Sequence, residues 1–505
     1  MISVTSSPSF DESFKKRCIF FRMLSLSRFS EFQEDGQVAT CEVDGKVRYS
    51  LPSECDSVIS RLIPFVAELP NVTFSEASIN SISAKYTSAS PKELFLSVEG
   101  TKWDGIKTAW FEQGFISALL VTLETNLKFS FFNNLIQNVT KLAYKYSNRA
   151  NVEGEEDIIL PEYCLCKNWK NGLFRYIQWH PHCSKFAVVT VKDDVHIYSA
   201  GSTITSVLKH RTQQFITCVA WRPLSASELA VGCSKGVYVW NIEPNSIVTK
   251  PSITCATLLS RPGHKYVTSV SWNQQGNLLV SASLCDRAMY VWDVSMERAV
   301  PLQKYGGGIP VLVKWSPTSE HIFASTTNIL FRIWSSVSWS SENWYTGSNR
   351  IKCACWSSDG SVLLFATTAE PTIYAITVSS AFNIFADTAT GNGNAICVAD
   401  LTRQELSNGE ILGGNIIDMA WDSSGKLLAV IFKDSNLIPV FSTTICSRPK
   451  VLQLTPRCLI RGRLNEIPNC IDFQKNVKYG TNLTIAWSSG RIQYFPFYTS
   501  DAIFI

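Results

Sequence analysis

Apolar and polar positions alternate along most of the chain after residue 160, and they do so in one arrangement that recurs. A strand ending in Trp leads through a turn to a second apolar strand, and a tight turn then leads to a third strand ending in an aromatic residue. The clearest copy is Ser269–Val294, SVSWNQQGNLLVSASLCDRAMYVWDV. Trp272 ends its first strand, Leu278–Ser283 forms its second, and Met289–Trp292 forms its third.

Six further copies make seven in all. They span Ile177–Tyr198, Cys218–Trp240, Leu312–Trp334, Cys353–Ile376, Asp418–Phe441 and Cys470–Phe495. The seven first strands end at Trp179, Trp221, Trp272, Trp315, Trp356, Trp421 and Phe473, with successive gaps of 42, 51, 43, 41, 65 and 52 residues. Units of about 40–45 residues with three or four short strands are typical of WD-type propeller blades. The sequence therefore predicts a mainly β fold in which residues 160–499 form a seven-bladed WD40-type β-propeller, with these seven aromatic residues as blade anchors.

The longest gap contains Thr388–Glu410, which is rich in Gly, Asn and Thr and lacks sustained alternation. Such a composition indicates a surface loop, so we expect a loop insertion over 388–410. The third copy also carries His264 after a glycine, Asp286 in the tight turn, and Trp292 at the end of the third strand. These three residues resemble the buried hydrogen-bonded set of WD repeats.

The part before the propeller reads in three pieces. Residues 1–35 are Ser-rich and mixed in charge, which predicts a flexible tail. Residues 36–100 open with two alternating runs around an Asp-Gly pair, so Gln37–Leu51 is predicted to form a β-hairpin. Because propellers often close by pairing an N-terminal strand with the last blade, we expect this hairpin beside Arg491–Phe497. A hairpin free of the propeller is the alternative.

The third piece, 101–148, is predicted to be helical. Apolar residues recur every four positions along it, from Phe111 to Leu135, and so share one helical ridge. Three roles remain open for this ridge: packing on the propeller, docking a partner, or lying at a membrane surface as a helix with few charges.

Composition narrows the class of protein. Of the 505 residues 45% are hydrophobic and 17% charged, so the chain can bury a sizeable core. The net charge of +4 gives no field for gripping phosphate backbones, and we expect no direct nucleic-acid partner. The 16 cysteines sit singly in apolar runs, which favours a reducing compartment. We find no secretory signal pattern, and we expect no transmembrane segment because the longest uncharged run, Pro371–Ala386, is too short.

Candidate catalytic and metal-binding groups are few. His180, His182 and Cys183 follow the first blade's Trp and are interpreted as a turn rather than a metal site. The pairs Cys164/Cys166 and Cys353/Cys355 lack a second pair at zinc-finger spacing, so we interpret them as structural. Nothing assembles a nucleophile, a base and an orienting group. The sequence therefore predicts a protein that is not an enzyme and has neither cofactor nor metal.

An aromatic-rich stretch follows the fourth copy. It holds Trp334, Trp339 and Trp344, with Tyr345 next. Exposed Trp and Tyr dominate binding hot spots, so these three Trp residues are candidate partner contacts. Packing between blades is the alternative.

Several segments together resemble the aladin family of WD-repeat nucleoporins. The likeness lies in Trp179–Tyr198, Leu208–Cys233, Gly263–Val294 and Gly306–Trp334, and it continues to Tyr498. Runs such as Trp-His-Pro-His and Pro-Leu-Ser-Ala-Ser are not general WD features. The resemblance covers roughly the whole propeller, whereas the first hundred residues match only vaguely.

The resemblance implies a non-enzymatic component of the nuclear pore complex at the nuclear envelope, with spindle or cytoplasm in mitosis left open. It implies other nucleoporins as partners, notably a transmembrane nucleoporin of the pore membrane that would anchor the propeller, and a role in nucleocytoplasmic transport. Peripheral contact with the membrane also stays open. The competing hypotheses are a generic WD40 scaffold, such as a substrate receptor of a ubiquitin ligase, and a propeller enzyme.

Overall fold

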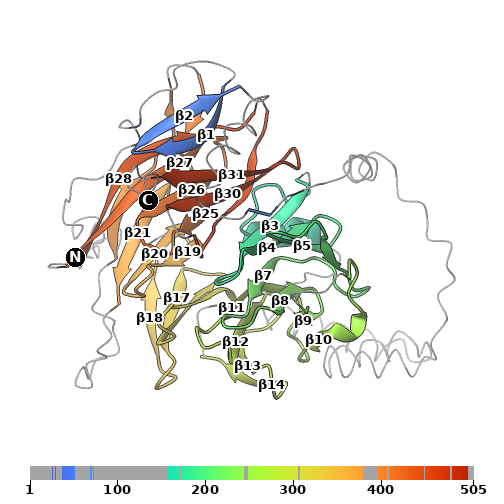
Figure 1. The fold of residues 1–505 in the computed structure, drawn as a ribbon. Helices are drawn as coiled ribbons and strands as arrows, with labels where there is room; N and C mark the ends of the chain where they lie inside the picture. Colours follow the sequence, from blue (N-terminus) through green and yellow to red (C-terminus); the bar gives the residue numbers. More distant parts are fainter. Residues whose placement is uncertain are drawn as a thin grey trace, which may run out of the picture.

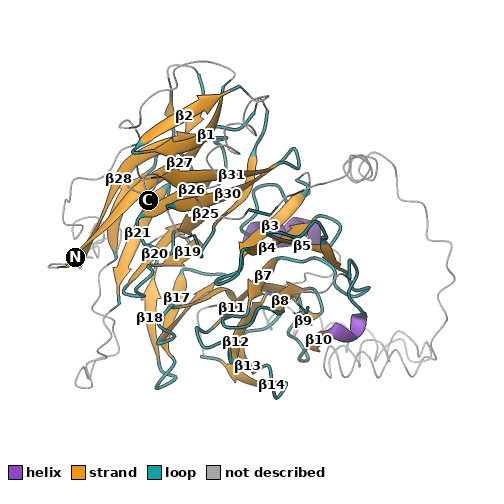
Figure 2. Cartoon of the chain, in the orientation of Figure 1, coloured by secondary structure: helices purple, strands orange, loops and turns teal. Residues whose placement is uncertain are grey.

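The computed structural model describes two isolated residues, Leu26 and Phe29, and a set of ranges. These ranges are 37–51, 69–70, 72, 156–170, 172–243, 248–304, 308–347, 349–378, 395–406, 409–447, 450–463, 465–477 and 480–498. The predicted helical segment 101–148, nearly all of the predicted tail 1–35 and most of 52–100 lie outside the described residues. Almost all of the regular secondary structure in the described chain is β-strand (Figure 2).

Seven blade sheets follow one another in chain order, which confirms the predicted propeller (Figure 1). Blade 1 comprises β3 (Phe174–Trp179), β4 (Lys185–Thr190), β5 (Val195–Ser199) and β6 (Ser206–Leu208), and blade 2 comprises β7 (Cys218–Trp221), β8 (Glu228–Cys233), β9 (Gly236–Asn241) and β10 (Ala256–Leu259). Blade 3 comprises β11 (Val267–Trp272), β12 (Leu278–Ser283), β13 (Met289–Asp293) and β14 (Arg298–Leu302). Blade 4 comprises β15 (Pro310–Trp315), β16 (His321–Thr326), β17 (Leu330–Ser335) and β18 (Ser341–Tyr345).

Blade 5 comprises β19 (Ile351–Trp356), β20 (Val362–Thr367), β21 (Thr372–Thr377) and β22 (Ile396–Asp400). Blade 6 comprises β25 (Ile416–Trp421), β26 (Leu427–Phe432), β27 (Ile438–Ser447) and β28 (Lys450–Ile460). Between them lies a two-stranded sheet of β23 (Gln404–Glu405) and β24 (Ile411–Leu412). Strands β22 and β23 both fall inside the predicted loop 388–410, so that prediction was wrong for 396–400 and for 404–405. Strand β22 pairs with β21 and completes blade 5.

Blade 7 comprises β29 (Pro468–Phe473), β30 (Thr481–Trp487) and β31 (Ile492–Tyr498), and it is completed by β1 (Val38–Val43) and β2 (Lys46–Ser50). The N-terminal hairpin therefore adds the two outer strands of the last blade, as expected, and is not free. Strand β1 runs parallel to β31, with Glu42 opposite Phe497. The other neighbouring strands in the blades pair antiparallel.

The first strands of the blades contact one another in a closed ring, from β3 through β7, β11, β15, β19, β25 and β29 back to β3. Within a blade, the second strand is more buried than the outer strand. Strands β16, β20 and β26 are buried along their whole length, whereas the outer strands β14 and β18 are largely exposed. A blade covers both faces of its inner strands with the neighbouring blades, so it cannot fold alone.

The apolar core is divided around the ring. Within the described ranges, each of the seven spaces between adjacent blades holds its own cluster of buried apolar residues. An eighth cluster joins the start of the propeller segment to the ring. It contains α7 (Glu156–Tyr163), a helix of eight residues. A short 3-10 helix, η3 (Ile253–Cys255), precedes β10. No helix among the described residues is long and apolar enough to cross a bilayer.

Candidate functional site

The predicted blade anchors join the first strands of neighbouring blades. Three indoles donate hydrogen bonds from Nε1 to a carbonyl of the preceding blade: Trp221 to Gln178 at 3.1 Å, Trp272 to Ala220 at 3.0 Å, and Trp356 to Lys314 at 3.1 Å. In each case the accepting residue stands directly before the anchor of the preceding blade. The repeated Trp therefore fixes the spacing between blades as well as filling the core.

The other anchors differ in detail. Trp315 donates to the carbonyl of Ser319 in the turn of its own blade, and Trp421 donates to Thr443 Oγ1. Phe473 has no donor and is buried at 1% exposure. Counting Trp179, four of the seven anchors thus donate an indole hydrogen bond across a blade boundary.

Trp179 closes the ring. Its backbone N–H donates to Asp472 Oδ2 at 2.7 Å, and its indole donates to Thr484 Oγ1 at 2.8 Å, both in blade 7. Burial raises the pKa of Asp472, against the opposing effects of Lys475 and the Trp179 N–H. At the boundary between blades 3 and 4, the hydroxyl of Ser271 accepts a hydrogen bond from the backbone N–H of Trp315 at 2.9 Å. A carboxylate therefore takes the place of a hydroxyl at the closure.

The N-terminal hairpin is held by polar groups as well as by strand pairing. Glu42 is fully buried and accepts two hydrogen bonds of 2.8 Å from the guanidinium of Arg457 on β28. The Gly45 N–H also donates to Glu42 Oε1. Gln493 on β31 donates to the carbonyl of Ala39 at 2.7 Å. The hairpin is thus bound to blade 6 as well as to blade 7.

The predicted WD set of blade 3 forms only in part. Ser281 Oγ lies 2.7 Å from His264 Nε2 and accepts from the Trp292 indole at 2.8 Å. Asp286 does not join them: its carboxylate accepts from the Ala288 N–H and the Tyr290 hydroxyl. The prediction was wrong for Asp286, because its turn directs the carboxylate to the start of β13 rather than to His264.

His180 belongs to a turn, as interpreted from the sequence. Its Nδ1 accepts the N–H groups of His182 and Cys183, and its Nε2 lies 2.9 Å from the carbonyl of Ser225. Since Nδ1 accepts, Nε2 carries the proton and the ring is neutral. Burial lowers the pKa of His180 to about 4. Both ring nitrogens are thus used within the protein.

The C-x-C cysteines are structural thiols by their environment. Cys164, Cys166 and Cys353 are buried, and burial raises the pKa of Cys166 to about 11 and that of Cys355 to about 12. A thiol in this state is a poor nucleophile. Within the described part of the chain, no group of three or more His, Cys, Asp or Glu side chains could hold a metal ion.

Of the three candidate contact tryptophans, the structure leaves one exposed. Trp334 lies on β17 at 4% exposure, and Trp344 on β18 stacks on Phe331 with ring centroids 6.0 Å apart. As a partner contact Trp334 was predicted wrongly, because its ring is buried between blades. Trp344 is partly buried, and its role as a contact stays a prediction. Trp339 lies in the turn from β17 to β18, is 38% exposed and has a positive φ of 53°.

Residues 156–172 cover one end of the ring, which sequence reasoning did not predict. We call them the cap. Their contacts reach several blades. Glu156 accepts from the Tyr266 hydroxyl, and Glu162 pairs with Arg350 at 3.0 Å. Lys167 donates from Nζ to the carbonyl of Ser435 and from its backbone N–H to the carbonyl of Asn469, and the guanidinium of Arg175 lies 3.9 Å from the centroid of Trp169. The cap thereby touches blades 1, 5, 6 and 7 as well as the segment leading into β11.

Four of the exposed apolar side chains lie in turns at the opposite end. Leu224 is 73% exposed in the β7–β8 turn, Met296 is 65% exposed between β13 and β14, and Val337 is 84% exposed beside Trp339. In a four-stranded antiparallel blade the first and third turns lie at the same end, and the cap contacts lie at the other. We call Leu224, Met296, Val337 and Trp339 the open face.

The chain is similar to known proteins that contain such a propeller. A family model described as the Aladin seven-bladed propeller matches residues 155–498, from just before the cap to the last strand. Aladin of Arabidopsis thaliana is 27% identical over 312 residues, which are 56% of this chain and 66% of the relative. The F-box-like/WD repeat-containing protein TBL1X is 26% identical over 149 residues in both mouse and human. Those residues are 28% of this chain and 27% and 25% of the two relatives.

Proposed function

This chain belongs to the aladin family of seven-bladed propellers, and on that premise we propose that it acts as a non-enzymatic nucleoporin, a docking platform of the nuclear pore complex. The observation that supports this most is the extent of the family match, which takes in the cap and all seven blades. The chain spans about two thirds of the length of the plant relative, so its role at the pore and in transport is part of the proposal.

The closed ring suits a docking role. Seven inter-blade clusters and the cross-blade indole bonds hold the turns of both ends in fixed positions. Rigid scaffolds of this kind present binding loops without needing a catalytic set. We place the anchoring contact, to a transmembrane nucleoporin of the pore membrane, on the open face, because Val337 and Trp339 offer exposed apolar area there.

Imaging tests both statements. The full chain carries a fluorescent tag at its own locus and is imaged at super-resolution against a pore marker in interphase cells. Val337→Ser/Trp339→Ser removes apolar area from the open face, and Ile158→Ser removes an exposed side chain of similar size from the cap, where it is 72% exposed. We expect rim signal at pores for the wild type and the Ile158 variant, and its loss for the double variant.

Two results would count against the proposal. Diffuse signal from the wild-type chain contradicts the pore role, and rim signal that survives in the double variant contradicts the open face as the anchoring surface. Melting curves of the three purified proteins establish that each is folded.

A second candidate function is a WD platform of another assembly, such as a substrate receptor of a ubiquitin ligase. The match to the F-box-like/WD repeat-containing proteins favours it, although only about a quarter of each relative is covered. Affinity purification of the tagged chain separates the two functions: ligase subunits in place of nucleoporins support this second candidate.

A further inference from the structure

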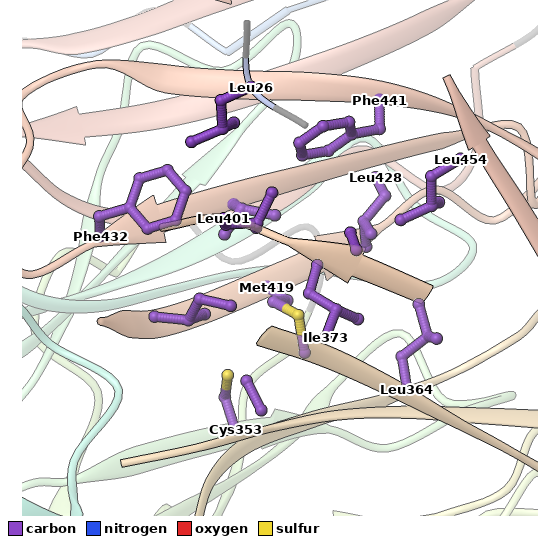
Figure 3. Packing of buried hydrophobic residues seen from close by; sticks show 14 of the residues in the cluster. Leu26, Cys353, Leu364, Ile373, Leu401, Met419, Leu428, Phe432, Phe441 and Leu454 are labelled. Atoms are coloured by element: carbon purple, nitrogen blue, oxygen red, sulfur yellow. The ribbon is translucent and has the colours of Figure 1, made fainter. Parts of the chain in front are cut away.

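Leu26 and Phe29 are buried in the ring, although both precede the hairpin and all seven blades in the sequence. Their exposures are 2% and 8%. They belong to the apolar cluster between blades 5 and 6, where Leu26 lies near Leu401 and Phe441 (Figure 3). A segment from the start of the chain thus occupies a place between two late blades.

The two side chains enter the cluster from one turn. The Phe29 N–H donates to the Leu26 carbonyl at 3.2 Å. In a turn of this 3-10 type the side chains at positions i and i+3 lie on the same side. Leu26 and Phe29 therefore form a pair of adjacent apolar anchors, spaced as Leu-x-x-Phe.

The ring offers these anchors a shaped groove. The ring of Phe29 meets that of Phe441 edge to face, with centroids 5.4 Å apart and planes at 67°. Leu26 lies over Gly413, whose φ is +95°, and a Cβ built on Gly413 would come within 2.6 Å of Leu26 Cδ1. The missing side chain at Gly413 thus makes the room that Leu26 fills.

Elements that depart from the standard blade form the walls of this groove. Strands β27 and β28 have 10 and 11 residues and pair far beyond the length of the other outer strands. They carry Phe441 and the buried Leu454. The two-stranded sheet β23–β24 contributes Leu412, next to Gly413. We call this site the blade 5–6 groove.

The ring does not need Leu26 and Phe29 for its closure. Its seven blades, the closing hairpin and the cap are built from residues 37–51 and 156–498. A pair of anchors that belongs to none of the blade strands can leave without breaking a strand pairing of the ring. We propose that the blade 5–6 groove is a peptide-binding site, filled in the same chain by Leu26 and Phe29, and that its ligand from a partner protein is a segment with Leu and Phe three residues apart.

A titration with a peptide tests this. The probe is a fluorescent peptide with the sequence of residues 22–33, and the proteins are the full wild-type chain and the full-length variant Leu26→Ala/Phe29→Ala. When the groove is filled within the chain, the apparent affinity for an external peptide falls in proportion to the fraction of empty groove. We therefore expect the variant to bind the peptide roughly tenfold or more tightly than the wild type.

Two controls make the result specific. A peptide with Ala at the positions of Leu26 and Phe29 should lose binding to the variant. The matched protein Leu224→Ala/Val337→Ala, which loses two exposed apolar side chains at the open face, should bind the probe no better than the wild type. The single variant Phe29→Ala replaces the double variant if the latter does not fold.

Equal affinity of the wild type and the variant would overturn the proposal, as would equal binding of the two peptides. The groove and its occupant are properties of the chain itself. The peptide titration can therefore fail while imaging places the protein at the pore, and the reverse also holds.

Discussion

His264 is an imidazole enclosed by blade 3, and burial lowers its pKa to about 3. Its Nδ1 makes no hydrogen bond within the described residues, because Asp286 is directed elsewhere. The folded chain therefore keeps this side chain neutral, whereas the unfolded chain binds a proton near the ordinary histidine pKa of 6.5. Since the unfolded state takes up more protons below that value, stability falls as the pH falls.

We expect the pH dependence to weaken when His264 is replaced. From about pH 7 to about pH 5, this one side chain should cost about 2 kcal/mol of stability. His264→Gln should melt lower at neutral pH but lose less on acidification. Urea unfolding at a series of pH values measures both, with the exposed His182→Gln as the control. A wild-type slope retained in the His264 variant would assign the acid sensitivity to other groups.

Asp418 on β25 changes stability with pH in the opposite direction to His264. Burial raises its pKa from 3.8 to about 7, although Lys314 and the Met419 N–H lower it, while Asp472 nearby raises it further. The folded state thus binds a proton that the unfolded state releases above 3.8, so stability declines as the pH rises through 7.

Asp418→Asn removes the charge and keeps the shape. We expect the variant to melt a few degrees higher than the wild type at about pH 8 and at nearly the same temperature at about pH 4. Differential scanning calorimetry at the two pH values decides this. A variant that melts lower at both would mean that the ionised carboxylate is needed by the ring.

At the scale of elements, the hairpin β1–β2 depends on a buried charge. Glu42 is shielded from water, whereas its partner Arg457 is partly exposed on another blade. Arg457→Met would leave the carboxylate buried without a cation, so we expect a loss of about 3 kcal/mol. Glu42→Gln/Arg457→Met should lose less than the sum of the two single variants. Urea unfolding of the four proteins gives the coupling energy, and additive losses would show that the pair contributes little.

The cap is an element with little stability of its own. An isolated helix as short as α7 does not persist in water, and Pro161 lies inside it. Its order therefore comes from the ring, through contacts such as those of Glu156 with Tyr266 and Glu162 with Arg350.

We expect Tyr266→Phe/Arg350→Met to release the cap without opening the blades. Amide hydrogen exchange over 156–170 should become faster, while the strands keep their protection. The matched control is Arg222→Met, which removes an ion pair with Glu228 at the opposite end of the ring. Faster exchange of the blades together with the cap would instead make the cap a part of ring stability.

For the molecule as a whole, the sequence predicted those features that are repeated or local. Each blade carries its own alternation and, in six of seven cases, its own Trp, so β12 was placed at Leu278–Ser283 with the correct bounds. The Asp-Gly turn likewise specified the N-terminal hairpin, and the need to close the ring indicated its place.

Features that depend on distant contacts were missed. Nothing near Val38–Val43 encodes that β1 runs parallel to β31. Strand β22 alternates too weakly to stand out from its polar surroundings, and it exists because β21 offers it a partner. The cap has no amphipathic repeat of its own, and most of its contacts come from segments that lie about 100 to 300 residues later in the chain.

The parallel strand β1 also sets an order of events during biosynthesis. Ala39 leaves the ribosome long before its partner Gln493, which stands 454 positions further along the chain. At about 5–20 residues per second, roughly 20–90 s pass between the two. Throughout that interval blade 7 does not exist and blade 1 lacks its neighbour. Each nascent chain thus carries open sheet edges until blade 7 has been synthesised, which makes it a client for chaperones that shield such edges.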